Sequence, residues 1–160
     1  MTRRAAALAR AGERGTRRRA AMSDEDYRAL AAFRCEIRGF LAWSERTARA
    51  FELEPQQHQL LLAVRGLPAG REPTVGAAAE RLCVEHHTAV ALVDKLEARG
   101  LLRRERSPGD RRKVLLSLTP AGARLLGALS TVHKRHLNEQ GQPMLGALRA
   151  ILGELGRSSE

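Results

Sequence analysis

The chain has few aromatic residues, few cysteines and no long apolar segment. Phe, Trp and Tyr make up 3% of its 160 residues, whereas hydrophobic types together make up 43%. Any core must therefore be built from Leu, Ala and Val, which favours helices over an aromatic-rich sheet. No window holds about 18 consecutive apolar residues, so the sequence predicts no membrane-spanning helix. The N-terminal arginines precede no continuous apolar signal region, and we expect a cytoplasmic protein.

Cysteine is represented only by Cys35 and Cys83. Two cysteines so far apart do not form a disulfide framework, and a reducing cytosol suits them, so we expect two free thiols. Cys35 lies within a predicted helix among apolar residues, which favours a buried, inert thiol. The neighbouring Arg34 and Arg38 keep a redox sensor as the alternative.

The net charge of +10 is distributed unevenly along the chain. Residues 1–22 carry seven Arg and one Glu and have no apolar periodicity, which predicts a disordered basic tail. Residues 99–113 carry seven basic groups against Glu105 and Asp110, and the rest is nearly neutral. Such a local excess favours binding to a polyanion, because affinity comes from charge density and counterion release. A solvated charged surface is the alternative.

The spacing of apolar residues and of capping residues predicts six helices and one hairpin. Pro55 suits the first turn of a helix, Thr74 and Thr119 suit N-caps, and Gly100 suits a C-cap. The predicted helices are 24–50, 55–65, 74–82, 86–100, 119–137 and 143–155, and the predicted strands are 101–106 and 113–118. The sequence therefore indicates a mainly α fold with a small β-hairpin.

Three consecutive helices followed at once by a basic hairpin are the layout of a winged helix-turn-helix. In this layout the third helix enters the major groove of DNA and the hairpin, called the wing, reaches an adjacent minor groove. The three helices are 55–65, 74–82 and 86–100, so the helix predicted to enter the major groove is 86–100. Its two faces differ, with Ala89, Leu92, Val93 and Leu96 on one side and His87, Thr88, Ala91, Asp94 and Lys95 on the other.

The residues along this layout resemble the MarR family of bacterial regulators. The resemblance runs through LEPQQHQLLL (53–62), TVGAAAERL (74–82), TAVALVDKLEARGL (88–101) and DRRKVLLSLTPAG (110–122). Its most specific part is Asp-x-Arg at 110–112 with Leu-Thr-Pro-x-Gly at 118–122, since this joins a wing tip to a helix cap. The resemblance implies a DNA-binding winged helix-turn-helix at 53–118, with dimerisation helices at 23–52 and 119–160.

The resemblance also implies which residues contact DNA. Asp110 would brace the wing, and Arg112 would enter the minor groove, which is narrow and strongly negative in A·T-rich DNA. Cys83 and Glu85 depart from the family, which often has Gly and Ser or Thr there. The predicted DNA-contacting residues are His86, His87, Thr88, Lys95, Arg103, Arg104, Arg111, Arg112 and Lys113. His86 and His87 either read bases or are merely solvated, and Lys95 is expected to bind a phosphate.

Four further hypotheses concern what the protein does and which signal it responds to. The family resemblance implies a small organic effector, often an aromatic acid, with Phe40, Trp43 and His58 as pocket candidates; ordinary core packing is the alternative. A metal sensor would use His133 and His136 with His58 or Cys35, although such histidines are more often ordinary surface groups. An architectural DNA-binding protein is a third possibility. Catalysis is disfavoured by the absence of G-x-S-x-G, P-loop and H-E-x-x-H motifs. No cofactor or bound metal is expected.

Apolar stripes on the last two predicted helices exceed what one small lobe covers. They predict a homodimer that reads an inverted repeat. The stripes consist of Leu125, Leu126, Leu129 and Val132 on the fifth helix, and of Leu145, Leu148, Ile151, Leu152 and Leu155 on the sixth.

Overall fold

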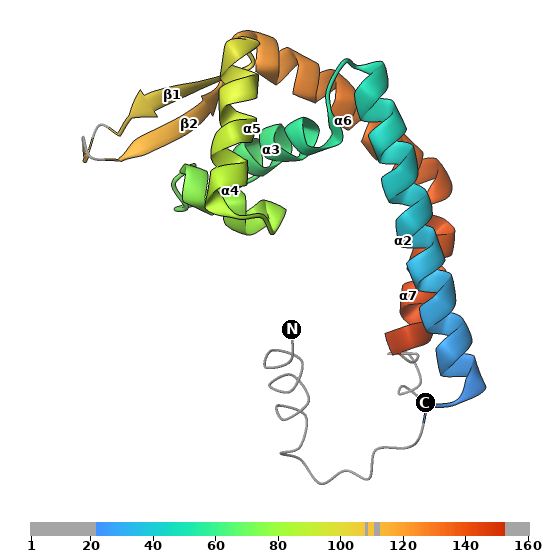
Figure 1. Ribbon diagram of the computed structural model, residues 1–160. Helices are drawn as coiled ribbons and strands as arrows, with labels where there is room; N and C mark the ends of the chain where they lie inside the picture. The colour runs from blue at the N-terminus through green and yellow to red at the C-terminus, as the bar shows by residue number, and fades with distance from the viewer. Residues whose placement is uncertain (1–21, 108, 111–112, 153–160) are drawn as a thin grey trace, which may run out of the picture.

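The computed structural model describes residues 22–107, 109–110 and 113–152. The predicted tail, Met22 apart, lies outside these residues, as does the predicted last helix beyond Leu152. The described residues form six helices and one antiparallel hairpin, which confirms the predicted mainly α fold with a wing (Figure 1). The elements are α2 (Asp24–Ala50), α3 (Pro55–Arg65), α4 (Val75–Leu82), α5 (His86–Ala98), β1 (Leu102–Arg106), β2 (Val114–Leu118), α6 (Pro120–Gln140) and α7 (Gln142–Leu152).

Capping side chains fix where several helices begin. The Ser23 hydroxyl accepts a hydrogen bond from the Asp26 N–H at 3.1 Å, and the Asp26 carboxylate accepts one from the Ser23 N–H at 2.8 Å. Thr74 and Thr119 each accept from the N–H three residues later. These bonds satisfy N–H groups that have no partner within the helix. The predicted starts at Thr74 and Thr119 are confirmed.

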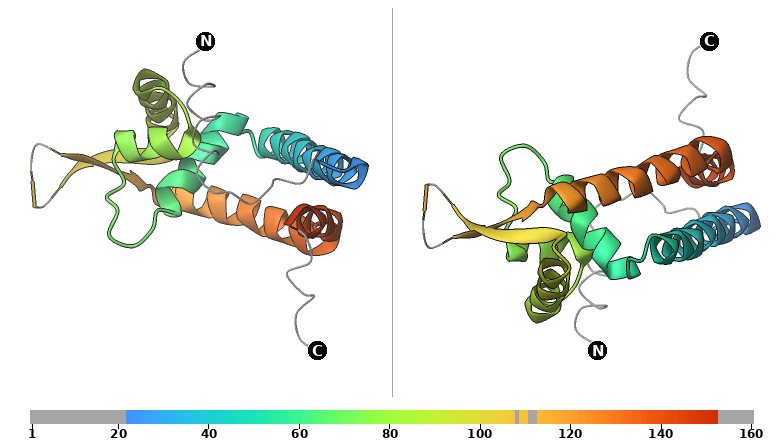
Figure 2. Two further views of the ribbon diagram at one scale, coloured as in Figure 1. Left: turned by 90° about the horizontal axis from the view of Figure 1, so that it is seen from below. Right: turned by 90° about the horizontal axis from the view of Figure 1, so that it is seen from above.

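The molecule consists of a lobe and an arm. Helices α3, α4 and α5 and the hairpin form the lobe, whereas α2 and α7 lie side by side in the arm, and α6 runs from the wing into the arm (Figures 1 and 2). The hairpin projects from the lobe away from the arm. None of the described helices has both the length and the apolarity that spanning a bilayer requires.

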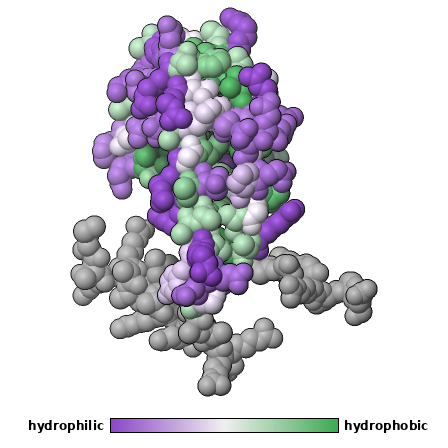
Figure 3. Space-filling model, turned by 90° about the vertical axis from the view of Figure 1, so that its right-hand side faces the viewer, coloured by the Kyte–Doolittle hydropathy of each residue, from purple (hydrophilic) through white to green (hydrophobic). Residues whose placement is uncertain are grey.

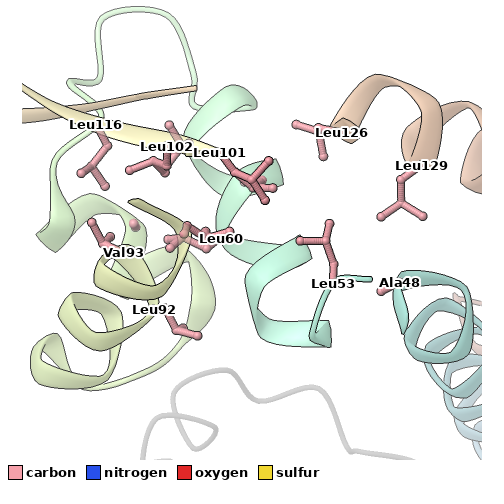
Figure 4. Close-up of a cluster of buried hydrophobic side chains, with 14 residues drawn as sticks. Ala48, Leu53, Leu60, Leu92, Val93, Leu101, Leu102, Leu116, Leu126 and Leu129 are labelled. Carbon is pink, nitrogen blue, oxygen red and sulfur yellow. The ribbon is translucent and has the colours of Figure 1, made fainter. Parts of the chain in front are cut away.

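One hydrophobic cluster joins the lobe to the base of the arm. Leu60, Leu96 and Leu116 are fully buried in the lobe, and the cluster continues through Leu53 to Leu129 of α6 (Figure 4). The position of the wing relative to the arm is therefore set by a continuous core.

Two predictions about buried residues are wrong. Cys35 is exposed, because a residue two positions from Phe33 and from Ile37 lies nearly on the opposite side of the helix. Leu126 and Leu129 were expected on a dimer surface, but both are buried within this chain. They are buried because α6 packs against α3 and β2 before it reaches the arm.

Candidate nucleic-acid interface

Helix α5 is positioned as the recognition helix of a winged helix-turn-helix. Its buried face packs on the core through Ala89, Leu92, Val93 and Leu96. The other face exposes His86, His87, Ala91, Asp94 and Lys95, and Thr88 is half-buried. The predicted division of this helix into an inner and an outer face is confirmed.

The turn before α5 contains the two residues that depart from the family pattern. Cys83 ends α4 with a φ of 55°, in the left-handed region that favours glycine. Glu85 is then the N-cap of α5, in an extended conformation, and its side chain forms no capping hydrogen bond. A non-glycine residue therefore adopts a conformation for which glycine is the usual choice.

The wing is a regular two-stranded ribbon. Leu102 pairs with Leu118, and Arg104 pairs with Leu116. At the end of the ribbon, the Lys113 N–H donates to the Asp110 carbonyl at 2.9 Å. The predicted wing-tip contacts Arg111 and Arg112 lie outside the described residues, and the bracing role of the Asp110 side chain stays a prediction.

Several predicted DNA-contacting side chains form ion pairs within the protein. Arg104 contacts Asp94 at 2.6 Å and also Glu97. Lys113 contacts Glu72 of the α3–α4 loop at 2.7 Å, and this hydrogen bond raises the pKa of Lys113. Arg103 contacts Glu105 of the same strand at 2.5 Å and Ser117 of the paired strand at 3.0 Å.

Other basic side chains at this surface are not engaged in this way. Lys95 on α5 and Arg106 on β1 are exposed, and neither forms an ion pair within the described part of the chain. Arg106 was not among the predicted contacts. Its position at the outer end of β1, close to the wing tip, is the signal that points to it.

Comparisons with known proteins agree with this geometry. A MarR family model matches residues 51–113. The transcriptional repressor CouR of Rhodococcus jostii, solved with a 23-mer DNA duplex, is 30% identical, with coverage of 74% of this chain and 84% of that one and a TM-score of 0.57. The chain belongs to the MarR family.

Two further similar proteins are a transcriptional regulator and a transcriptional repressor. The regulator BldR of Sulfolobus solfataricus is 28% identical, with a TM-score of 0.58 and coverage of 82% of this chain and 98% of that one. The HTH-type transcriptional repressor NicR of Pseudomonas putida is 46% identical over 46 residues. That match spans only 29% of each chain.

The candidate effector pocket of this MarR-family chain lies where the arm meets the lobe. A cavity of about 370 Å³ is lined by Phe40, His58, Leu62, Ser130, His133, Lys134, Leu137 and Asn138. Trp43 instead lines a neighbouring cavity of about 380 Å³ between α2, α6 and α7, which Phe40 also lines. The predicted pocket residues therefore divide between two adjoining cavities.

Histidine and aromatic rings from three helices form the wall between these cavities. His136 stacks on Trp43 with ring centroids 3.6 Å apart, and His58 lies 4.8 Å from His133. The Nδ1 of His133 lies 2.9 Å from the Leu129 carbonyl, which can only accept, so Nδ1 carries the proton. In the neutral ring, Nε2 then accepts from the Ser44 hydroxyl at 2.7 Å.

His58 is the most unusual residue of this wall. It is 3% exposed, and its Nδ1 has no hydrogen-bond partner. Burial lowers the pKa of His58 to about 4, and the charge of His133 contributes in the same direction. In the described ranges, no group of three or more His, Cys, Asp or Glu side chains is placed to hold a metal ion.

Proposed function

We propose that this MarR-family protein is a cytoplasmic transcriptional repressor that binds an inverted-repeat operator as a homodimer and responds to a small organic effector. The exposed polar face of α5 beside a basic wing is the observation that supports DNA binding most directly. NicR and CouR are transcriptional repressors, which supports the same direction of regulation. A footprint on the protein's own promoter region tests the proposal, since an architectural protein gives no discrete protected site.

The apolar surface of the arm is the observation that supports the proposed homodimer. Hydrophobic residues run along it between hydrophilic ones on the face shown in Figure 3. The large apolar side chains that remain exposed on its helices are Tyr27, Leu30, Leu41, Leu137, Leu145 and Leu152. A second copy would cover these side chains. The assignment of residues 23–52 and 119–160 to dimerisation is part of this proposal.

We expect the dimer to persist at micromolar concentration and to place two copies of α5 about 34 Å apart. Sedimentation measures the first property, and a footprint with two-fold symmetry measures the second. Leu145→Asp introduces a charge into the exposed apolar face and is expected to shift the protein toward monomer. A wild-type monomer, or a footprint without two-fold symmetry, contradicts the dimer.

The effector proposal rests on the junction between the arm and the lobe. The cavity lined by His58 lies between α2, α3 and α6, so an occupant would contact both the arm and the lobe. In a dimer, the two lobes can adopt different spacings. A ligand that binds more tightly at one spacing shifts the dimer toward it. The resulting change in operator affinity is set by the difference between the ligand's affinities for the two spacings.

Arg112 provides a direct test of the wing. We expect Arg112→Ala to weaken operator binding by about 1–3 kcal/mol while the dimer and the helix content stay unchanged. Equilibrium binding to the footprinted DNA at physiological salt measures this. Unchanged affinity would remove this side chain from the DNA contact.

A further inference from the structure

Arg104 differs from its neighbours in the wing because its side chain faces the recognition helix. In the strand register it lies opposite Leu116, which is fully buried, and two residues from buried Leu102. Alternate residues of a strand share a face, so Arg104 lies on the inner face and Arg103 on the outer one. The exposures agree, at 29% for the Arg104 side chain and 57% for that of Arg103.

Arg104 binds two carboxylates of α5 at once. One guanidinium nitrogen lies 2.6 Å from Asp94, and the other contacts Glu97. The backbone N–H of Arg104 also donates to Glu97, at 3.2 Å. A planar guanidinium suits such a double contact, because its donors are fixed in a fork. The hydrogen bond that the Arg104 guanidinium donates to Asp94 is the main reason that the pKa of Arg104 is raised.

The other strand of the wing is attached to a different part of the lobe. Lys113 contacts Glu72 at 2.7 Å, and the Leu116 N–H donates to the Pro73 carbonyl at 2.6 Å. The buried Leu102 and Leu116 anchor the base of the wing, and the contacts of Arg104 add a polar attachment of β1 to α5 that bears on the angle between the wing and α5. A wing in the minor groove and a helix in the major groove must fit one duplex together, so this angle affects affinity.

We propose that Arg104 is a positioning residue, which acts through Asp94 and Glu97 to hold the wing against the recognition helix and does not itself bind a phosphate. This role replaces the direct DNA contact that the sequence predicted for it. The inference rests on the proposed DNA-binding function.

The salt dependence of DNA binding separates the two roles. A duplex that the wild-type protein selects from a random pool serves as the probe, and binding is measured at several salt concentrations. Arg104→Ala is expected to lower affinity about tenfold and to leave the slope of log K against log salt unchanged. A phosphate contact would instead reduce the magnitude of that slope by about 0.9. Such a reduction, or unchanged affinity, overturns the proposal.

Two further variants keep the test decisive if Arg104→Ala folds poorly. Arg104→Lys keeps the charge but does not offer a fork to two carboxylates, so we expect affinity to recover only in part. Full recovery contradicts the proposal, since a lysine serves well at a phosphate. In the Asp94→Asn/Glu97→Gln background, Arg104→Ala is expected to have little further effect, whereas a phosphate contact would keep its full effect.

Lys95→Ala is the matched control, because Lys95 is exposed on α5 and forms no ion pair within the described residues. It is expected to reduce the magnitude of the slope by about 0.9. A wild-type protein that binds no duplex even at low salt would refute the DNA-binding function itself. Failure of the Arg104 proposal alone leaves wild-type binding intact, so the two failures are distinguishable.

Discussion

Gly122→Ala is expected to destabilise the protein by about 3 kcal/mol or more. Gly122 is buried in the first turn of α6, and a Cβ atom there would lie 1.9 Å from the Leu101 carbonyl oxygen and 2.8 Å from its carbon. The carbonyl is not free to move aside, because it accepts the Thr119 N–H at 3.1 Å. Either α6 or the start of the wing must shift.

Gly127→Ala is the matched control in the same helix. A Cβ at position 127 has no neighbour within 4 Å, and alanine is the better helix former by about 1 kcal/mol. Gly127→Ala is therefore expected to stabilise the protein slightly. Urea unfolding followed by circular dichroism measures both variants. Equal stabilities for the two variants would show that the approach to Leu101 relaxes without cost.

The Leu-Thr-Pro-x-Gly motif shows what sequence reasoning supplied at this point and what it lacked. Thr119 was predicted as the cap, and Pro120 in the first turn follows from the same local chemistry. The requirement for glycine at 122 depends on a backbone atom that is 21 positions earlier in the chain. Such a requirement is not visible in local propensities.

At the DNA-binding surface, too, the features with local causes were predicted and those with distant causes were missed. The outer face of α5 follows from a helical period, and the pairing of β1 with β2 follows from two short strands around a turn. The ion pairs of Arg104 and Lys113 do not follow, because their partners are set by how the wing packs against α5 and the α3–α4 loop. Composition revealed the excess of charge but not which charges are already neutralised.

The burial of α6 illustrates a third limit. An apolar stripe on a helix predicts a buried face but does not specify what buries it. Leu126 and Leu129 are covered by this chain, whereas Leu145 and Leu152 on α7 remain exposed. The same pattern therefore serves the internal core in one helix and an open surface in the next.

The free energy of unfolding is expected to fall by about 3 kcal/mol between pH 8 and pH 4 through His58 alone, at the junction between the arm and the lobe. The pKa of His58 is about 4 in the folded protein, below its ordinary value of 6.5, because burial penalises the charged ring. The neutral ring is therefore favoured by folding. Its contribution is complete above pH 6.5 and falls as the pH drops from 6.5 toward 4, by about 1.4 kcal/mol per pH unit.

The surroundings of His58 give the charged ring no compensation. The cavity that it lines also receives His133 and Lys134, and the described lining residues include no carboxylate. The unfolding free energy is measured with urea at a series of pH values. Subtracting the curve of a variant without His58 from that of the wild type isolates the contribution of His58 from those of the other titrating groups. The wild-type curve minus that of His58→Leu should fall with the predicted slope, whereas wild type minus His87→Ala, which removes an exposed ring, should stay nearly flat. A flat first difference would show that His58 reaches water in the native state and that the junction opens more readily than its packing indicates.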